Sequence, residues 1–391
     1  MTSAARLTPS SAPPPDLPTA PRYGSASLPD LLPSLLPGLG VPGETPTLAL
    51  PPASRVVLLL IDGLGAEQLE AAEDAPFLTA HYDAAATIDA GFPATTPVSL
   101  TSLGCGAPPG VHGVTGFFMR RPEDGVVLNL LHLPPELEPR DLQPIPTTFE
   151  RAVAAGVSVS RVGPRSFDGV GLTEYGLRGG DYVSADRIGE RIAAVEQAVR
   201  GGDRALVYAY YGDLDATGHR NGCQSVAWER ELTHVDSVVE QLAGRLPDDC
   251  LLVVTADHGM VDIPADARWD LATSPELDAG VDVLAGDPRA VHVHARPGAE
   301  ADVLAAWSEF LGGNAWVVSR DVAIEQGWFG PTVAPEFRGR IGDVVAAMRT
   351  DVAVVDSRFL PSTILSLVGL HGSLTTAEQR VPLVVIPAEV R

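Results

Sequence analysis

An unbroken apolar run that ends in a carboxylate is the feature that most constrains this chain. The run occupies Arg55 to Gly63, with the sequence RVVLLLIDG and with Asp62 at its carboxyl end. Its length and β-branched content are typical of a strand buried on both faces of a parallel sheet. An acid after such a strand lies at the carboxyl edge of the sheet, where open α/β folds bind their ligands.

Two further runs repeat this pattern. ALVYAYYGDLD leads to Asp215, and LLVVTADHG ends in Asp257 and His258. Because adjacent residues of a strand point to opposite faces, Asp257 and His258 can share a ligand only from an irregular loop. Three acids at three strand ends, with histidines beside them, predict a site at one edge of the sheet.

The order of the patterns predicts the fold class. Helical and strand patterns alternate along most of the chain, which favours a doubly wound, mostly parallel sheet with helices on both faces. Residues 21–391 are expected to form this α/β domain, and a strand–helix–strand pattern at about 265–355 predicts a small inserted α+β cap. Residues 1–20 are rich in Pro, Ser and Ala and are expected to be disordered.

Charge and composition exclude several classes of function. The formal net charge is -23, which argues against binding to a nucleic-acid duplex or an anionic membrane. No run reaches the roughly 20 apolar residues of a membrane span, and no secretory leader is recognisable. The three cysteines are widely spaced and predict reduced thiols. A cytoplasmic protein is therefore expected, whose oligomeric state the sequence does not indicate.

A threonine provides a candidate reactive hydroxyl. Thr96 precedes Pro97 and the segment VSLTSLG. Proline favours the first turn of a helix and threonine is a good N-cap, so Thr96 is expected to cap a helix whose free N–H groups suit a phosphate. A cap without chemistry is the simpler alternative, and the neighbouring Thr95 is a second candidate for the nucleophile.

The acids and histidines form a set that suits two divalent cations. Gly218 is expected to allow a tight turn between Asp215 and His219. Mixed carboxylate and imidazole ligands suit Zn²⁺ or Mn²⁺. Two such ions about 3.5–4 Å apart stabilise the attacking and leaving oxygens of an in-line displacement, and coordination activates a hydroxyl. A threonyl-phosphate intermediate on Thr96 follows as a prediction. The alternating His292 and His294, with no acid nearby, are interpreted as part of a solvated edge strand.

The order IDG, FPATTP, DLDATGH, ADHG and HG resembles the alkaline phosphatase superfamily, and within it the nucleotide pyrophosphatase/phosphodiesterase family. The resemblance covers about residues 50–390. It implies Thr96 as the nucleophile, and it implies two metal ions, one held by Asp62, Thr96, Asp257 and His258 and the other by Asp215, His219 and His371. The family often has an asparagine three residues after the nucleophile to bind a phosphoryl oxygen, where this chain has Ser99, a shorter donor.

The resemblance predicts a metal-dependent hydrolase of phosphodiester or pyrophosphate bonds that acts on a small phosphate ester or nucleotide. No arginine closely follows Thr96, which favours a diester over a doubly charged monoester. The alternatives are a phosphomonoesterase, a phosphonate hydrolase or a phosphosugar mutase of the same superfamily, and a non-enzymatic metal-binding protein. For Arg161 and Arg165, contact with an anionic substrate is the alternative to the favoured structural or surface role. For Tyr210, stacking on a nucleobase is the alternative to the favoured core position.

Overall fold

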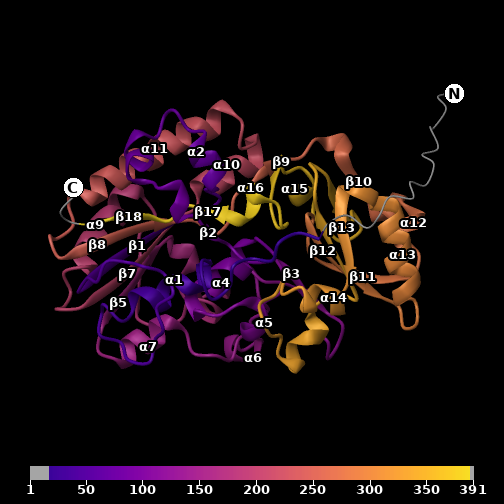
Figure 1. Ribbon diagram of the computed structural model, residues 1–391, viewed down its shortest axis with the longest axis horizontal. Helices are drawn as coiled ribbons and strands as arrows, with labels where there is room; N and C mark the ends of the chain where they lie inside the picture. The colour runs from indigo at the N-terminus through magenta and orange to yellow at the C-terminus, as the bar shows by residue number, and fades with distance from the viewer. Residues whose placement is uncertain (1–16, 388–391) are drawn as a thin grey trace.

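The computed structural model describes residues 17–387 (Figure 1). The expected disorder of residues 1–20 falls mostly on residues 1–16, which lie outside the described residues. None of the described helices is long and apolar enough to cross a membrane.

A six-stranded sheet forms the centre of the larger part of the molecule. Its order is β18-β8-β1-β7-β5-β6, and all neighbours run parallel except the edge strand β18. The strands are β1 (Arg55–Ile61), β5 (Ser158–Gly163), β6 (Asp181–Ser184), β7 (Ala205–Tyr211), β8 (Cys250–Thr255) and β18 (Val384–Ile386). The apolar run in β1 is buried from residue 56 to 61, as a central strand requires.

Helices cover both faces of this sheet (Figure 1). One side carries α1 (Leu28–Leu35), α4 (Thr96–Cys105) and α7 (Thr148–Ala154); the other carries α3 (Pro76–His81), α9 (Ile188–Ala198) and α11 (Val226–Ala243). Local capping fixes where two of them begin. The Ser225 hydroxyl accepts from the backbone N–H of Trp228 at the start of α11, and Thr147 with Glu150 forms a capping box at α7. The predicted α/β class with a mostly parallel sheet is confirmed.

A second, antiparallel sheet packs beside the carboxyl edge of the first. Its order is β13-β14-β12-β11-β3-β4, with β3 (Phe118–Arg120), β4 (Val127–Asn129), β11 (Val281–Asp287), β12 (Ala290–Ala295), β13 (Ala315–Ser319) and β14 (Val344–Met348). Helix α13 (Glu300–Leu311) packs on one face, and Trp328 and Phe329 lie in a separate apolar cluster. Strands β3 and β4 come from outside the expected insertion at 265–355, whose boundaries stay a prediction.

The interpretation of His292 and His294 as part of a solvated edge strand is wrong. Strand β12 lies between β14 and β11, and the two side chains are only 1% and 3% exposed. Burial disfavours the charged imidazolium and lowers the pKa of His292 to about 4 and that of His294 to about 2. Both rings are therefore neutral parts of the interior, which alternation of residue types alone does not reveal.

Short elements complete the chain between these layers. They are α2 (Ala66–Glu70), β2 (Ile88–Asp89), α5 (Pro109–His112), α6 (Pro139–Leu142), α8 (Gly171–Tyr175), α10 (Asp213–Asn221), β9 (Val261–Asp262), β10 (Arg268–Asp270), α12 (Pro275–Asp278), α14 (Arg320–Glu325), β15 (Ala353–Val355), α15 (Ser362–Leu365), β16 (Gly369–Leu370), α16 (Thr376–Gln379) and β17 (Arg380–Val381). The three cysteines are buried and free of disulfides, as predicted.

Candidate active site

The carboxyl edge of the parallel sheet gathers the predicted acids. Asp62 directly follows β1, and its N–H donates to the carbonyl of Tyr211 at the end of the neighbouring β7 (2.9 Å). Asp257 and His258 lie in the irregular segment after β8, the next strand on the other side. Because the strands are parallel and in register, their ends meet, and the predicted residues meet with them.

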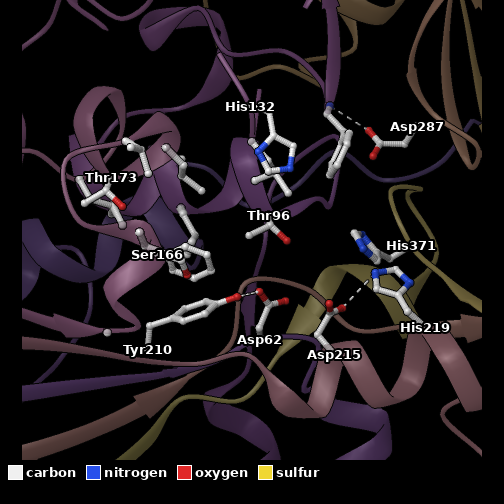
Figure 2. Close-up of a pocket in the computed structure, with 18 of the residues that line it drawn as sticks. Asp62, Thr96, His132, Ser166, Thr173, Tyr210, Asp215, His219, Asp287 and His371 are labelled. Atoms are coloured by element: carbon white, nitrogen blue, oxygen red, sulfur yellow. Dashed lines mark hydrogen bonds and ion pairs between the residues drawn. The ribbon is translucent and has the colours of Figure 1, made fainter. Parts of the chain in front are cut away.

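Helix α10 contributes two further side chains. Asp215 and His219 are four residues apart on this helix and therefore share one face, with Asp215 Oδ1 3.3 Å from His219 Nε2 (Figure 2). The expected tight turn at Gly218 is wrong, because Gly218 is helical. Glycine leaves room there for Met260, because a Cβ atom would lie 2.5 Å from its sulfur and the Met260 side chain would have to shift. His371, after β16, faces Asp215 and His219.

Thr96 presents its hydroxyl to this cluster. It is the first residue of α4, and the N-cap is Thr95, whose backbone is extended, so the predicted cap position is wrong by one residue. The Thr95 hydroxyl donates to Asp287 Oδ1 (2.9 Å), whereas Thr96 Oγ1 lies 3.2 Å from His258 Nε2. Of the two candidate threonines, Thr96 is the one beside the histidines and acids.

Each of the three histidines is held by a backbone carbonyl. The Nδ1 atoms lie 2.7, 3.0 and 2.8 Å from carbonyl oxygens, for the pairs His219–Gly369, His258–Gly259 and His371–Ala94. Donation from Nδ1–H to a carbonyl fixes the tautomer and leaves Nε2 with a free lone pair. This is the arrangement in which proteins present histidine to a metal.

Each of the three acids keeps one buried oxygen without a hydrogen-bond donor among the described residues. These atoms are Oδ1 of Asp62, Oδ1 of Asp215 and Oδ2 of Asp257. The second oxygen of Asp62 accepts from the hydroxyl of Tyr210, and that of Asp257 accepts from the N–H groups of Gly63 and His258. Buried carboxylate oxygens normally have a donor or a cation, so the set fits bound cations.

The shifted pKa values of the acids and histidines also fit bound cations. Burial, followed by the charges of Asp257 and Asp215, raises the pKa of Asp62 well above its ordinary value. Burial also raises the pKa of Asp257, and burial together with His258 and His219 lowers the pKa of His371 well below its ordinary value. Like groups therefore crowd one another at this site, and a nearby positive ion relieves the repulsion between the carboxylates.

The potential ligand atoms fall into two overlapping groups. In each group all atoms lie within 4.8 Å of one another, and the groups are Asp215, His219, His371 and Asp62, Asp215, His258. The first has the composition expected for one ion. The second shares Asp215 and omits Asp257, although Asp257 Oδ2 lies 3.4 Å from His258 Nε2.

A cavity of about 550 Å³ extends from the cluster between the two sheets. Thr96, Asp62 and His371 line one part of it, and aromatic and aliphatic side chains line much of the rest (Figure 2). Ser99 is not among the lining residues. It is fully buried in α4, and its hydroxyl has no hydrogen-bond partner among the described residues.

Several residues that line the cavity were not assigned to the site from the sequence. Asp287 ends β11, is hydrogen-bonded by Thr95, and has its pKa raised to about 7 by burial. Tyr210, expected in the core, lines the cavity together with Tyr208. Their alternation in ALVYAYY is a signal that places both on one face of the strand. Arg161 also lines the cavity, a position that fits the less favoured of its two predicted roles, contact with an anionic substrate.

Residues 56–374 match the family model for type I phosphodiesterase / nucleotide pyrophosphatase. The chain belongs to this family. It is therefore a member of the alkaline phosphatase superfamily.

Solved structures share this family's fold. Murine ectonucleotide pyrophosphatase/phosphodiesterase 5 superposes with a TM-score of 0.69 at 17% identity, covering 84% of this chain and 87% of that one. An inactive threonine-to-alanine variant of it, in complex with AMP, gives 0.68. Phosphonoacetate hydrolase from Sinorhizobium meliloti 1021, in complex with phosphonoacetate, gives 0.65 at 19% identity, covering 87% and 91%.

Curated relatives match over shorter segments. Phosphopentomutase from Anaeromyxobacter dehalogenans is 37% identical over 119 residues, which are 30% of this chain and 28% of that enzyme. The catalytic subunit of human GPI ethanolamine phosphate transferase 3 is 30% identical over 90 residues, 23% of this chain and 8% of that protein. The chain thus spans under a third of the length of the curated relatives that it matches.

Proposed function

We propose that this protein is a metal-dependent hydrolase of phosphodiester or pyrophosphate bonds in small phosphate esters or nucleotides, with Thr96 as its nucleophile. One observation carries the proposal. The Thr96 hydroxyl lies 3.2 Å from His258 Nε2, at a cluster of three buried carboxylate oxygens that lack donors and three histidines fixed through Nδ1. The inactive threonine-to-alanine variant of the murine relative, bound to AMP, supports a threonine in this role.

Two divalent cations, Zn²⁺ or alternatively Mn²⁺, belong to the proposal. Asp62, Thr96, Asp257 and His258 would hold one, and Asp215, His219 and His371 the other. When bound, such a pair lowers the pKa of a nucleophilic hydroxyl and stabilises charge on the attacking and leaving oxygens. The backbone carbonyls behind the histidines and the Tyr210 hydroxyl behind Asp62 keep the ligand side chains oriented.

The reaction would proceed in two displacements at phosphorus. Thr96 Oγ1 gives up its proton to solvent and bonds to phosphorus, while the bond from phosphorus to the leaving oxygen breaks and that oxygen takes a proton from solvent. Water then attacks the phosphorus of the threonyl phosphate, the Thr96–phosphate bond breaks, and the hydroxyl of Thr96 is restored. The N-terminus of α4 offers backbone N–H groups to the phosphoryl oxygens during both steps.

The wall of the cavity favours a singly charged phosphorus centre. Among the described residues that line it, Arg161 is the only arginine, and it belongs to β5 rather than to the segment around Thr96. A doubly charged monoester would need more positive charge beside the nucleophile. The family resemblance implies the Ser99 hydroxyl as a phosphoryl ligand, but Ser99 does not line the cavity, so this role is not part of the proposal. A cytoplasmic location remains a further part of it.

Metal analysis combined with a substrate panel tests the function. Purified protein is loaded with Zn²⁺ or Mn²⁺, its metal content is measured, and hydrolysis of diesters, pyrophosphates, monoesters and phosphonates is compared on one sample. We expect two ions per chain and the highest kcat/KM with a diester or a pyrophosphate. Faster turnover of a monoester or phosphonate, or sugar-phosphate isomerisation, would select an alternative reaction. Metal binding with no turnover of any substrate would support a non-enzymatic metal-binding protein.

A further inference from the structure

A buried arginine without an acidic partner lies in the wall of the cavity. Arg161 is 6% exposed and makes no ion pair within 4.0 Å among the described residues. Its terminal nitrogens donate to the carbonyls of Thr173 (3.2 Å) and Gly180 (3.4 Å), and its Nε has no partner. Two long hydrogen bonds to neutral oxygens leave most of the five N–H donors of the guanidinium unused.

Burial of a charged guanidinium is unfavourable unless a negative charge or hydrogen-bond acceptors compensate it. An ion moved out of water without a counter-charge costs several kcal/mol, so buried arginines are normally paired. The guanidinium carbon lies 5.6 Å from the centre of the Tyr182 ring, and the carboxylates of Asp168, Glu174 and Asp181 lie in the surroundings without forming an ion pair. These contacts compensate the charge in part, and an anion bound in the cavity would complete the compensation.

A second unsatisfied polar group lies on the adjacent strand. Tyr208 of β7 is the direct Cα partner of Arg161 in the parallel pairing with β5, so both side chains leave the sheet on the same face. Tyr208 is 3% exposed, lines the same cavity, and its hydroxyl has no hydrogen-bond partner among the described residues. A phenolic O–H beside a guanidinium is a pair of donors that suits an anion.

We infer that Arg161 and Tyr208 form a subsite for a second anionic group, a carboxylate or a phosphate, on the organic part of the substrate. The inference rests on the proposed function and narrows its substrate class. The phosphorus centre lies at Thr96, an apolar portion of the substrate lies against side chains such as Phe167 and Leu172, and the second anion reaches the subsite. Carboxylate and phosphate share the chemistry that a guanidinium recognises.

Matched diesters test the subsite. Three 4-nitrophenyl aryl phosphates are compared that share a leaving group and differ at the far end of the retained aryl ring, which carries a carboxylate, a phosphate or a neutral carboxamide. We expect wild-type protein to prefer at least one anionic substrate over the carboxamide by about tenfold or more in kcat/KM, in keeping with a charged hydrogen bond. Arg161→Gln should bring this ratio close to one, and Tyr208→Phe should lower it about threefold. The two anionic arms identify which anion is bound.

Arg165→Gln is the matched control, because Arg165 lies four residues away with a 74% exposed side chain that faces Asp186 rather than the cavity. It should leave the ratio unchanged. A wild-type ratio near one overturns the inference even if the Arg161 variant fails to fold. Equal losses on all three substrates in Arg161→Gln, with the ratio kept, would also overturn it and indicate a structural role.

A binding measurement separates this inference from the proposed function. Calorimetry with metal-loaded protein compares phenylphosphonate with 4-carboxyphenylphosphonate, neither of which needs to react. Tighter binding of the carboxylated probe to wild type, lost in Arg161→Gln, supports the subsite even if no diester is hydrolysed. Equal binding of the two probes by an active hydrolase, together with kcat/KM ratios near one for both anionic diesters, would reject the subsite and leave the hydrolase standing.

Discussion

The two ends of the cavity differ in how their polar groups are satisfied. At the Thr96 end, acids and histidines converge from β1, α10, the segment after β8 and the segment after β16, and each histidine has a backbone carbonyl behind it. At the far end, Arg161 and Tyr208 stand among apolar side chains with few partners. We propose that the first end holds cations and that the second accepts an anion. Changes at the first end should therefore abolish chemistry, and changes at the second should alter substrate choice.

Replacement of the proposed nucleophile gives the largest expected effect. Thr96→Ala should lower kcat/KM by about 10³-fold or more, because loss of a nucleophile removes the covalent route. Metal content should stay near that of wild type, since the acid and histidine ligands remain. Steady-state kinetics and metal analysis on the same preparation check both statements.

Thr95→Ala is the matched control for this prediction. It removes a hydroxyl that donates to Asp287 and does not face His258. We expect a loss of about tenfold at most, from disturbed packing at the start of α4. A larger loss in Thr95→Ala than in Thr96→Ala would reassign the nucleophile.

Metal removal should expose the repulsion within the cluster. Stripping wild-type protein with a chelator should lower its free energy of unfolding by about 3 kcal/mol for each of the two ions, the amount that one ion contributes at about a hundredfold its Kd. The effect of Asp62→Asn on the free energy of unfolding should change sign when metal is bound. The metal-free variant should be more stable than metal-free wild type, because it lacks a buried charge close to Asp257 and Asp215. The metal-loaded variant should be less stable.

Urea unfolding with and without Zn²⁺ measures these differences. Asp213→Asn provides the control, because Asp213 is an exposed acid at the start of α10 outside both ligand groups. It should change stability equally in the two states. A metal-free Asp62→Asn protein that is less stable than metal-free wild type would contradict the crowding of charge at this end.

The acids at the Thr96 end of the cavity could be predicted from the sequence because strand ends are local features. A buried apolar run fixes where a parallel strand stops, and the parallel register then brings Asp62 and Asp257 together without further information. Two predictions about details that local patterns do not determine were wrong. Thr95 rather than Thr96 caps α4, and DLDATGH continues as a helix past Gly218. At these positions the Thr95 hydroxyl donates to Asp287 and Gly218 packs against Met260, and neither contact is visible in the local sequence.

At the second end the sequence named contact with an anionic substrate as a possible role of Arg161 but did not favour it, for a related reason. Arg161 becomes a buried cavity residue through contacts with carbonyls 12 and 19 residues further along the chain, in segments without a clear pattern. His292 shows the same limit, because alternation of residue types in AVHVHA cannot tell an exposed edge from a strand placed between two others. Strand ends are encoded locally, whereas the neighbours of a side chain are encoded by the whole fold.

The pKa of Asp287 predicts a smaller, pH-dependent effect. The folded carboxyl keeps its proton up to about pH 7, whereas an unfolded carboxyl loses it near pH 4. The folded state therefore binds more protons between these values, and the free energy of unfolding falls as pH rises through this window. Asp287→Asn lacks this contribution, so its stability relative to wild type should rise from pH 4 to 7 by at most about 1.4 kcal/mol per pH unit. Urea unfolding of metal-loaded protein at several pH values measures the slope.

Asp282→Asn is the matched control on the same strand. Asp282 is exposed, and its carboxylate faces Arg120 at 3.7 Å. Its stability relative to wild type should show no comparable rise over pH 4–7. Parallel curves for Asp287→Asn and wild type would show that the Asp287 carboxyl is already ionised in the folded protein at low pH.

Replacement of Ser99 has the smallest expected effect. Its hydroxyl is buried in α4 without a partner and does not line the cavity, so Ser99→Ala removes an unsatisfied group. The free energy of unfolding should stay equal or rise by up to about 1 kcal/mol, and kcat/KM should change by less than about tenfold. Ser102→Ala on the same helix should instead lose about 1 kcal/mol, because its hydroxyl lies 2.9 Å from His112 Nε2. A loss of activity beyond tenfold in Ser99→Ala, with stability kept, would instead show that Ser99 reaches the phosphoryl group, as the family resemblance implies.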